Sequence, residues 1–140
     1  MIYVVPFRPE HLELMDVGTE PTFGGKPSVS VLKYMAKDHA FTVMRDGEPI
    51  ACGGTLTNWA GNYMAWAYMT AASGPHMLQI SRLVKQGLAG LKGRIAMTTP
   101  LRFKQGIRWA KLLGFEVETP VLKHWGIDGA DHVGFVRIQE

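Results

Sequence analysis

Alternating hydrophobic and polar positions predict a strand at the N-terminus and, further along, a meander of three strands. The N-terminal strand is expected at residues 2–7, and the meander at residues 39–44, 50–56 and 63–69. Asp46-Gly47 separates the first two strands of the meander, and this dipeptide favours the tight turn of an antiparallel hairpin. A second turn is expected at residues 58–62. This part of the chain is therefore predicted to form antiparallel sheet.

Two short helices are predicted between the first strand and the meander. Proline suits the first turn of a helix, so Pro9 is expected to open one that ends near Gly18. Residues 19–27, with two glycines and two prolines, are expected to form a loop. Ser28 can then cap a second helix that ends before Asp38.

Two longer helices are predicted in the second half of the chain. Pro75 is expected to open the first, whose hydrophobic residues recur every three or four positions up to Leu91. A short strand follows at residues 94–98, and Pro100 is expected to open the next helix, which Gly114 closes. The remaining strands are expected at residues 115–119, 121–125 and 133–138.

With the neighbouring strands at 115–119 and 121–125 counted as one, the order of elements, β-α-α-β-β-β-α-β-α-β-β, predicts an α/β fold with one mixed, mostly antiparallel central sheet. One helix must cross over between the strands at residues 63–69 and 94–98, and such a crossover makes a parallel pair. The sheet is therefore expected to hold one parallel pair, with helices on both faces. With 140 residues, of which 46% are hydrophobic, residues 1–140 are expected to form a single domain.

The net charge of +3 conceals an uneven distribution. No Asp or Glu occurs between Pro49 and Phe115. The cations in this acid-free segment are Arg82, Lys85, Lys92, Arg94, Arg102, Lys104, Arg108 and Lys111. Such a segment favours a negatively charged partner, either a phosphorylated cofactor or nucleic acid, with solvated basic helix faces as the alternative. Nucleic acid is the least favoured, because the cations occur singly on two helices and a strand.

The chain shows no pattern typical of secretion or of membrane insertion. No basic segment precedes a long hydrophobic one at the N-terminus, as a secretory signal requires. Residues 49–80 are low in charge, but glycines, asparagines and a proline interrupt them, so no spanning helix is expected. The single cysteine, Cys52, excludes a disulfide scaffold and is expected to be a buried thiol. We expect a cytoplasmic protein without membrane association.

The segment FKQGIRWAKLLGF, residues 103–115, is similar to a helix of a known family. Leu113-Gly114-Phe115 and the small Gly106 resemble the penultimate helix of the GNAT N-acetyltransferase superfamily. The order of elements resembles that family over nearly the whole chain. Phe103 stands where the family usually has Asn, and Ala110 stands where it usually has Tyr.

A narrower resemblance rests on the Ile107-Arg108-Trp109 run and on the short length of the chain. In both respects the chain looks like the phage-encoded GNAT-like proteins related to internal virion proteins of podoviruses. This resemblance implies a location in the host cytoplasm or the virion. It also implies an alternative function, that of a catalytically inactive GNAT-fold protein with a structural or host-interaction role.

The family resemblance implies acetyl-CoA as cofactor, held where the fourth and fifth strands separate. The pantetheine would pair with the backbone of residues 63–69, and the pyrophosphate would lie on the turn at residues 71–76, before a helix N-terminus. Only Gly74 remains of the family's glycine signature in that turn. The candidate cofactor-binding residues are Trp66, Ala67, Met69, Ser73, Gly74, His76 and Phe103.

Acetyl transfer to an amine requires a group that removes a proton and a group that protonates the leaving thiolate. The acid-free segment offers no carboxylate, so the base is expected from Glu20, Glu116 or Glu118, with solvated surface carboxylates as the alternative. Thr98 could orient a water molecule. Tyr68 could protonate the thiolate, which Ala110 cannot do, although a packing role for Tyr68 is the alternative. The candidate catalytic residues are Tyr68, Glu118 and Thr98.

One compact cluster has the chemistry of metal ligands. It consists of His124, Asp128, Asp131 and His132, on either side of a glycine-containing turn. The cluster lacks a recognised ligand spacing, and a solvated hairpin tip explains it more simply, so no metal site is predicted.

The residues and the family resemblance together imply an acetyl-CoA-dependent N-acetyltransferase. The acceptor would be an amine of a small molecule or of a protein. A homodimer that pairs through the late strands is expected from the resemblance alone. A GNAT-fold protein without catalysis remains the alternative.

Overall fold

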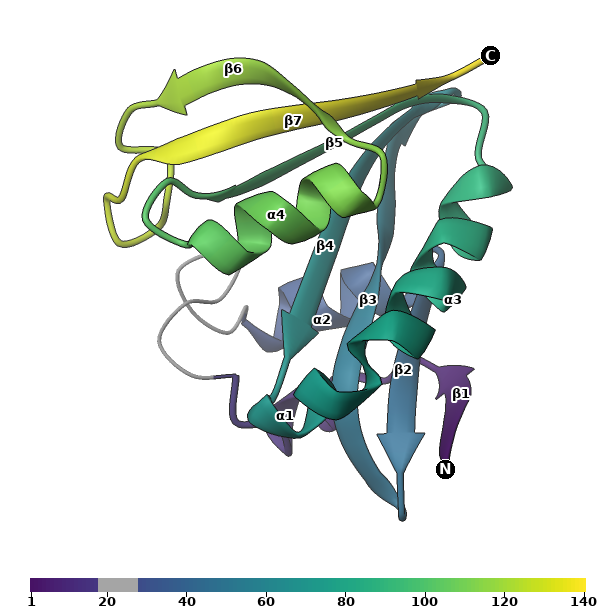
Figure 1. Ribbon diagram of the computed structural model, residues 1–140. Coiled ribbons are helices and arrows are strands. Elements are labelled where there is room, and N and C mark those ends of the chain that lie inside the picture. Colours follow the sequence, from purple (N-terminus) through teal and green to yellow (C-terminus); the bar gives the residue numbers. More distant parts are fainter. Residues whose placement is uncertain (18–27) are drawn as a thin grey trace.

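The computed structural model describes residues 1–17 and 28–140 (Figure 1). Seven strands form one sheet in the order β1-β2-β3-β4-β5-β7-β6. The strands are β1 (Ile2–Pro6), β2 (Ala40–Arg45), β3 (Glu48–Trp59), β4 (Asn62–Met69), β5 (Gly93–Pro100), β6 (Glu116–Leu122) and β7 (His132–Gln139). The helices are α1 (Pro9–Glu13), α2 (Val29–Ala36), α3 (Met77–Ala89), α4 (Lys104–Leu112) and the 3-10 helix η1 (Ala71–His76). The predicted α/β fold is confirmed.

The pairing of the strands follows the expected pattern. β4 and β5 are parallel, and the crossover between them contains η1 and α3. The other neighbouring strands are antiparallel. The hairpin between β2 and β3 turns at Asp46 and Gly47, whose φ angles of 51° and 79° are the left-handed values of a tight hairpin turn.

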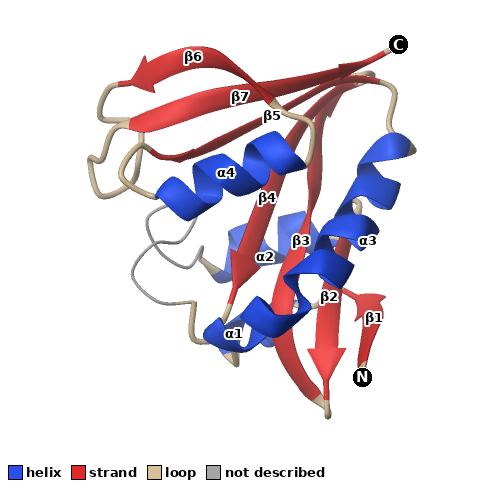
Figure 2. Cartoon of the chain, in the orientation of Figure 1, coloured by secondary structure: helices blue, strands red, loops and turns tan. Residues whose placement is uncertain are grey.

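Helices cover both faces of the sheet, as predicted (Figure 2). On one face, α1 and α2 pack through Leu12 and Leu32 against Trp66 of β4. On the other face, Ile80 of α3 packs among buried residues of β2 and β3, and Ala110 of α4 packs among residues of β5 and β7. The sheet therefore separates two hydrophobic layers.

Two prolines that were expected to open helices lie elsewhere. Pro75 lies inside η1, and α3 begins at Met77. The turn before it is tight because the backbone N–H and the hydroxyl of Ser73 both donate to the Thr70 carbonyl. Pro100 is the last residue of β5, where it pairs with His132 of β7. The expectation that these prolines open helices is therefore wrong.

Two other boundaries also differ from the predictions. The first helix, α1, ends at Glu13, well before Gly18, which lies outside the described residues. The strands predicted at 115–119 and 121–125 form one strand, β6, that continues through Pro120. Proline is tolerated there because β6 is the edge of the sheet, where a missing N–H interrupts no ladder on the open side.

Candidate active site

β4 and β5 lie together at one end only. Their ladder consists of three pairs, Asn62 with Arg94, Tyr63 with Ile95, and Met64 with Ala96. Glycine at position 93 allows the chain to approach Gly61 closely at this end, because a Cβ there would lie 2.2 Å from the carbonyl oxygen of Gly61. Beyond the three pairs the strands separate, as Figure 1 shows.

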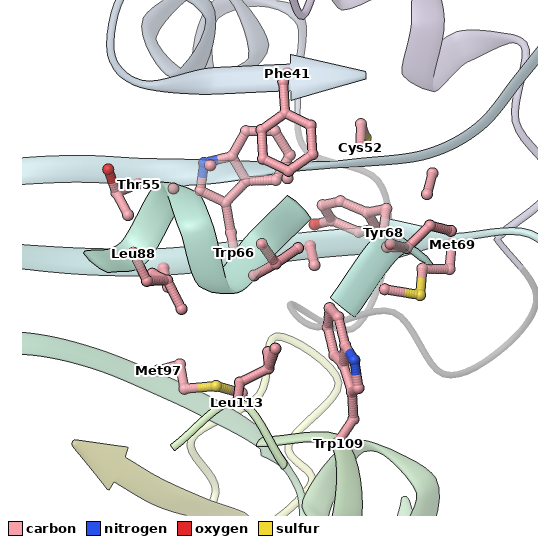
Figure 3. A pocket seen from close by; sticks show the side chains of 18 of the residues that line it. Phe41, Cys52, Thr55, Trp66, Tyr68, Met69, Leu88, Met97, Trp109 and Leu113 are labelled. Carbon is pink, nitrogen blue, oxygen red and sulfur yellow. The ribbon is translucent and has the colours of Figure 1, made fainter. Parts of the chain in front are cut away.

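A cavity of about 790 Å³ lies where the two strands separate. Its wall contains residues of both core layers, and Figure 3 shows Trp66 and Tyr68 of β4 around the same space as Trp109 and Leu113. Most of the wall is apolar, and among the described lining residues only Asp38 is an aspartate, glutamate, lysine or arginine. The cavity is therefore suited to a ligand with a long, largely uncharged body.

Small residues on β3 and β4 help to leave this space open. Ala51, Gly53, Gly54, Ala65 and Ala67 all line the cavity. Gly54 also permits a close approach of β2 to β3, since a Cβ there would lie 2.2 Å from the His39 carbonyl oxygen. Larger side chains at these positions would fill the cavity or push the strands apart.

Two buried polar atoms of residues that line the cavity have no hydrogen-bond partner in the part of the chain that the structure describes. They are Nε1 of Trp66 and Oγ1 of Thr55. Burial of an unsatisfied polar group costs stability, and such groups are rare in folded proteins. Both side chains are almost fully buried, so a ligand in the cavity would reach these two atoms only if neighbouring side chains moved.

Tyr68 and Cys52 are neighbours in the cavity wall, on paired positions of β4 and β3. Burial raises the pKa of the Cys52 thiol to about 12. Burial, reinforced by Cys52, raises the pKa of the Tyr68 hydroxyl well above its ordinary value. Both groups therefore keep their protons at neutral pH, which a proton donor requires.

The structure brings together most of the predicted site residues on β4, β5 and the start of α4. Those that line the cavity are Trp66, Ala67, Tyr68, Met69, Thr98 and Phe103. Phe103 stands directly before α4, and its backbone N–H donates to the Pro100 carbonyl. Six of the ten predicted site residues therefore line one cavity.

The three candidates in the turn lie apart from this wall. Ser73, Gly74 and His76 belong to η1, between the end of β4 and the start of α3, and they are not among the cavity-lining residues. Ser73 is buried, and its hydroxyl donates to the Thr70 carbonyl. They are nevertheless close to the cavity along the chain, because Met69 and Met77, on either side of η1, both line it.

The candidate carboxylates also lie apart from the cavity. Glu118 is exposed on β6 and makes a bidentate ion pair with Arg94, which lowers the pKa of its carboxyl group. Glu116, on the same strand, is exposed. Glu20 lies outside the described residues. The structure therefore gives no support to Glu118 as a base acting in the cavity.

Ala110 occupies a position without access to the cavity. Its side chain is fully buried and packs with Leu88, Ile95 and Phe135. Its neighbour Trp109 lines the cavity instead, and Nε1 of Trp109 donates to Oγ of Ser81 at 2.9 Å. A proton donor at position 110 would have to displace the core.

The structure places His132 differently from the solvated hairpin tip that the sequence predicts. His124, Asp128 and Asp131 are exposed, but His132 is only 1% exposed, because β7 begins there and pairs with β5. Nδ1 of His132 lies 3.0 Å from Oγ1 of Thr98. The sequence pattern does not reveal this pair, because the two residues are 34 positions apart.

In residues 1–17 and 28–140, no group of three or more His, Cys, Asp or Glu residues is arranged to hold a metal ion. Within the same residues, no helix has both the length and the apolar character needed to cross a membrane.

Comparison of the sequence with protein-family models and with curated proteins finds no match. Solved structures do match. A chain of the NatC complex bound to Gag peptide and CoA has a TM-score of 0.77 and 12% identity, over 99% of both chains. The ribosomal-protein-S18-alanine N-acetyltransferase from Escherichia coli has a TM-score of 0.70 and 10% identity, over 100% of this chain and 96% of that chain.

A third structure carries the family name. The acetyltransferase of GNAT family from Streptococcus pneumoniae has a TM-score of 0.68 and 9% identity, over 100% of both chains. The narrower resemblance to phage-encoded proteins receives no support from these structures. At such low identities the similarity concerns the fold, and together with the strand order it shows that this chain has the GNAT fold.

Proposed function

We propose that the protein is an acetyl-CoA-dependent N-acetyltransferase. The observation that carries this proposal is the cavity between β4 and β5, which opens where their three-pair ladder ends. The GNAT fold and the CoA named with one of its structural neighbours support the same cofactor. The acceptor would be an amine of a small molecule or of a protein.

The chain offers two features that suit the parts of CoA. The ladder between β4 and β5 ends at Met64, so the pantetheine arm, which contains amides, would lie along the following residues of β4. At the end of β4, η1 leads into α3, whose N-terminal N–H groups favour a phosphate. Ser73, Gly74 and His76 remain the proposed contacts there.

Exposed cations on α3 and near the start of α4 are a weaker argument for an anionic ligand than the cavity. Arg82 and Lys85 are exposed on α3, and Lys104 is exposed at the start of α4. Arg102 forms an ion pair with Asp128, with Nη2 and Oδ2 3.2 Å apart. Basic side chains of this kind would raise the local concentration of CoA.

One backbone group of β4 and two side chains that line the cavity would serve the chemical step. A backbone N–H of β4, in the segment Ala67–Met69, would polarise the thioester carbonyl, a role that requires no side chain. Tyr68, whose hydroxyl remains protonated, would protonate the leaving thiolate. Thr98 of β5, which also lines the cavity, would contact the acceptor amine or a water molecule bound to it.

Calorimetric titration with CoA and acetyl-CoA tests the binding step. We expect micromolar affinity for the native sequence. Ala67→Phe should weaken binding at least tenfold, because the ring fills the cavity beside β4. Ala89→Phe is the matched control, since Ala89 is exposed at the end of α3 and does not line the cavity. Absence of binding at millimolar CoA would overturn the proposal.

Release of free CoA from acetyl-CoA tests the transfer step, with peptides bearing a free N-terminal amine and small primary amines as acceptors. Tyr68→Phe should lower kcat by about 10²-fold or more while the affinity for CoA stays the same. Tyr63→Phe, at the paired end of β4, is the control. An unchanged kcat in Tyr68→Phe would remove Tyr68 from the mechanism.

A second candidate function is a GNAT-fold protein without catalysis. The observation that favours it is Ala110, which is buried in the core at the position where the resemblance expects a tyrosine. Binding of CoA without release of free thiol, over the whole panel of amines, would support this second candidate and contradict the first.

A further inference from the structure

Thr98 and His132 form a buried hydroxyl–imidazole pair at the edge of the cavity. Oγ1 of Thr98 lies 3.0 Å from Nδ1 of His132, and the two side chains are 7% and 1% exposed. Thr98 lines the cavity, whereas His132 does not. The imidazole is therefore placed behind the hydroxyl as seen from the cavity.

Side-chain alternation places this pair on the same face of the sheet as Tyr68. Ile95 and Met97 of β5 pack in the core layer of α4, so Thr98 points to the opposite face. Tyr68 packs with α1 and α2 on that opposite face. Tyr68 of β4 and Thr98 of β5 therefore line the cavity from the same face of the sheet.

Among residues 1–17 and 28–140, the other nitrogen of His132, Nε2, has no hydrogen-bond partner. It lies under the loop between β6 and β7, because a Cβ on Gly126 would be 2.9 Å from Nε2 and 2.6 Å from Oδ1 of Asp128. A buried imidazole bonded only through Nδ1 is unusual for a group whose role is packing alone. The polar contact that His132 makes is therefore the one between Nδ1 and the Thr98 hydroxyl.

We propose that Thr98 and His132 form a general-base relay, in which the acceptor amine loses a proton to the Thr98 oxygen while the Thr98 hydroxyl proton passes to Nδ1 of His132. The relay rests on the proposed acetyl transfer. It supplies the base that Glu118, paired with Arg94 on β6, does not provide in the cavity.

The protons balance over one turnover. An acceptor ammonium loses two protons as its nitrogen forms the new bond to the acetyl carbon and the carbon–sulfur bond breaks. One of them replaces the proton that Tyr68 gives to the thiolate of CoA, so that Tyr68 is protonated again at the end of the turnover. The relay holds the other on His132 as imidazolium and returns it through Thr98 to water when the products leave.

The charges around His132 are compatible with this role. Burial is the main influence and lowers its pKa, Asp128 from the β6–β7 loop raises it, and Arg102 from the segment after β5 lowers it. The imidazole is therefore neutral at neutral pH and free to accept a proton. The exposed carboxylate of Asp128 lies on the side where the imidazolium Nε2–H would point.

The proposal requires one tautomer, with the proton of the neutral imidazole on Nε2 and a lone pair on Nδ1. Long-range ¹H–¹⁵N NMR of the labelled protein distinguishes the two tautomers. We expect Nδ1 of His132 to be unprotonated and its resonance to move in Thr98→Val. The signals that disappear in His132→Asn assign the His132 ring. His124→Asn, which removes an exposed histidine of the β6–β7 loop, is the control. A neutral imidazole protonated at Nδ1 overturns the relay.

The pH profile of kcat/KM, measured with the most active amine of the acceptor panel, tests the relay in turnover. We expect the native enzyme to lose activity as the pH falls through the lowered pKa of His132. His132→Asn and Thr98→Val should lose this limb and about 10²-fold in kcat, whereas Thr98→Ser should keep both. His124→Asn is the control.

Failure of the relay and failure of the proposed function give different results. A protein that binds CoA and transfers acetyl groups with the same profile in Thr98→Val refutes the relay alone. A protein that binds no CoA refutes the proposed function and the relay together. Calorimetry on His132→Asn should give an unchanged affinity for CoA, because His132 lies outside the cavity wall.

Discussion

The indole Nε1 of Trp109 donates to the hydroxyl of Ser81 at 2.9 Å, and this contact joins α4 to α3 beside the cavity. Ser81 is buried, and Trp109 lines the cavity. The two helices lie on the same face of the sheet but belong to the two halves that separate at β4 and β5 (Figure 1). The hydrogen bond therefore spans the halves that form the site.

A double-mutant cycle measures what this contact contributes. Ser81→Ala leaves an indole N–H without its partner, and Trp109→Phe removes the donor, so each should lower the free energy of unfolding by about 1–3 kcal/mol. The double variant should lose less than the sum, because the two changes remove one bond. Urea unfolding gives the three values. Strict additivity would show that the bond contributes nothing.

Two glycine-to-alanine changes should act in opposite directions. Gly54→Ala places a Cβ 2.2 Å from the backbone oxygen of His39, so β2 and β3 must move apart, and we expect a loss of about 1–3 kcal/mol or more. Gly87→Ala, within α3, meets no atom within 4 Å and should stabilise by about 0.5–1 kcal/mol. Urea unfolding of both variants checks the signs. A stable Gly54→Ala protein would contradict the close approach.

The thiol of Cys52 should resist modification in the folded protein. Burial raises its pKa to about 12, so almost no thiolate is present at pH 8. We expect an aromatic disulfide reagent to react about 10²-fold more slowly with the native protein than with the protein in denaturant, where the pKa returns to about 8.5. Equal rates would show that the cavity admits the reagent and that the thiol ionises there.

The ion pair of Arg94 and Glu118 should make a small, pH-dependent contribution to stability. The pair lowers the carboxyl pKa of Glu118 in the folded state, so its contribution is present above the unfolded value of about 4.3 and disappears as the pH falls through the folded value. Glu118→Gln should therefore be less stable than the native protein at pH 7 and equal to it near pH 2. Urea midpoints at the two pH values measure this.

Glu116→Gln is the control for that measurement, since Glu116 is also exposed on β6. It should change the urea midpoint little at either pH. A loss in Glu118→Gln that persists unchanged at the lower pH would mean that the ion pair is not its cause.

The order of elements could be predicted from the sequence because it depends on local periodicity. Alternation along β2, β3 and β4 and the Asp46-Gly47 turn are properties of neighbouring residues. The parallel pair of β4 and β5 followed from the crossover alone. The positions of Pro75 and Pro100 were mispredicted because proline fits both a helix start and other conformations, and the surrounding pairing selects between them.

The candidate site could be predicted only in part, because its geometry depends on contacts between distant segments. Residues on β4 were expected from the family resemblance, and Trp66 and Tyr68 do line the cavity. His132 was assigned to a solvated tip, since nothing in its neighbours along the chain shows that β5 and β7 bury it. Glu118 was a candidate base, but the structure places it outside the cavity wall, where it pairs with Arg94.

By itself, the sequence determined the α/β order, the crossover and the acid-free segment that favours an anionic ligand, because each follows from residue type and spacing. The tertiary structure decided where β4 and β5 part, which side chains meet in the cavity, and which titratable groups are buried. Burial and pairing set the proton affinities of Cys52, Tyr68 and His132, and both depend on strand register and helix packing, which no short stretch of residues encodes.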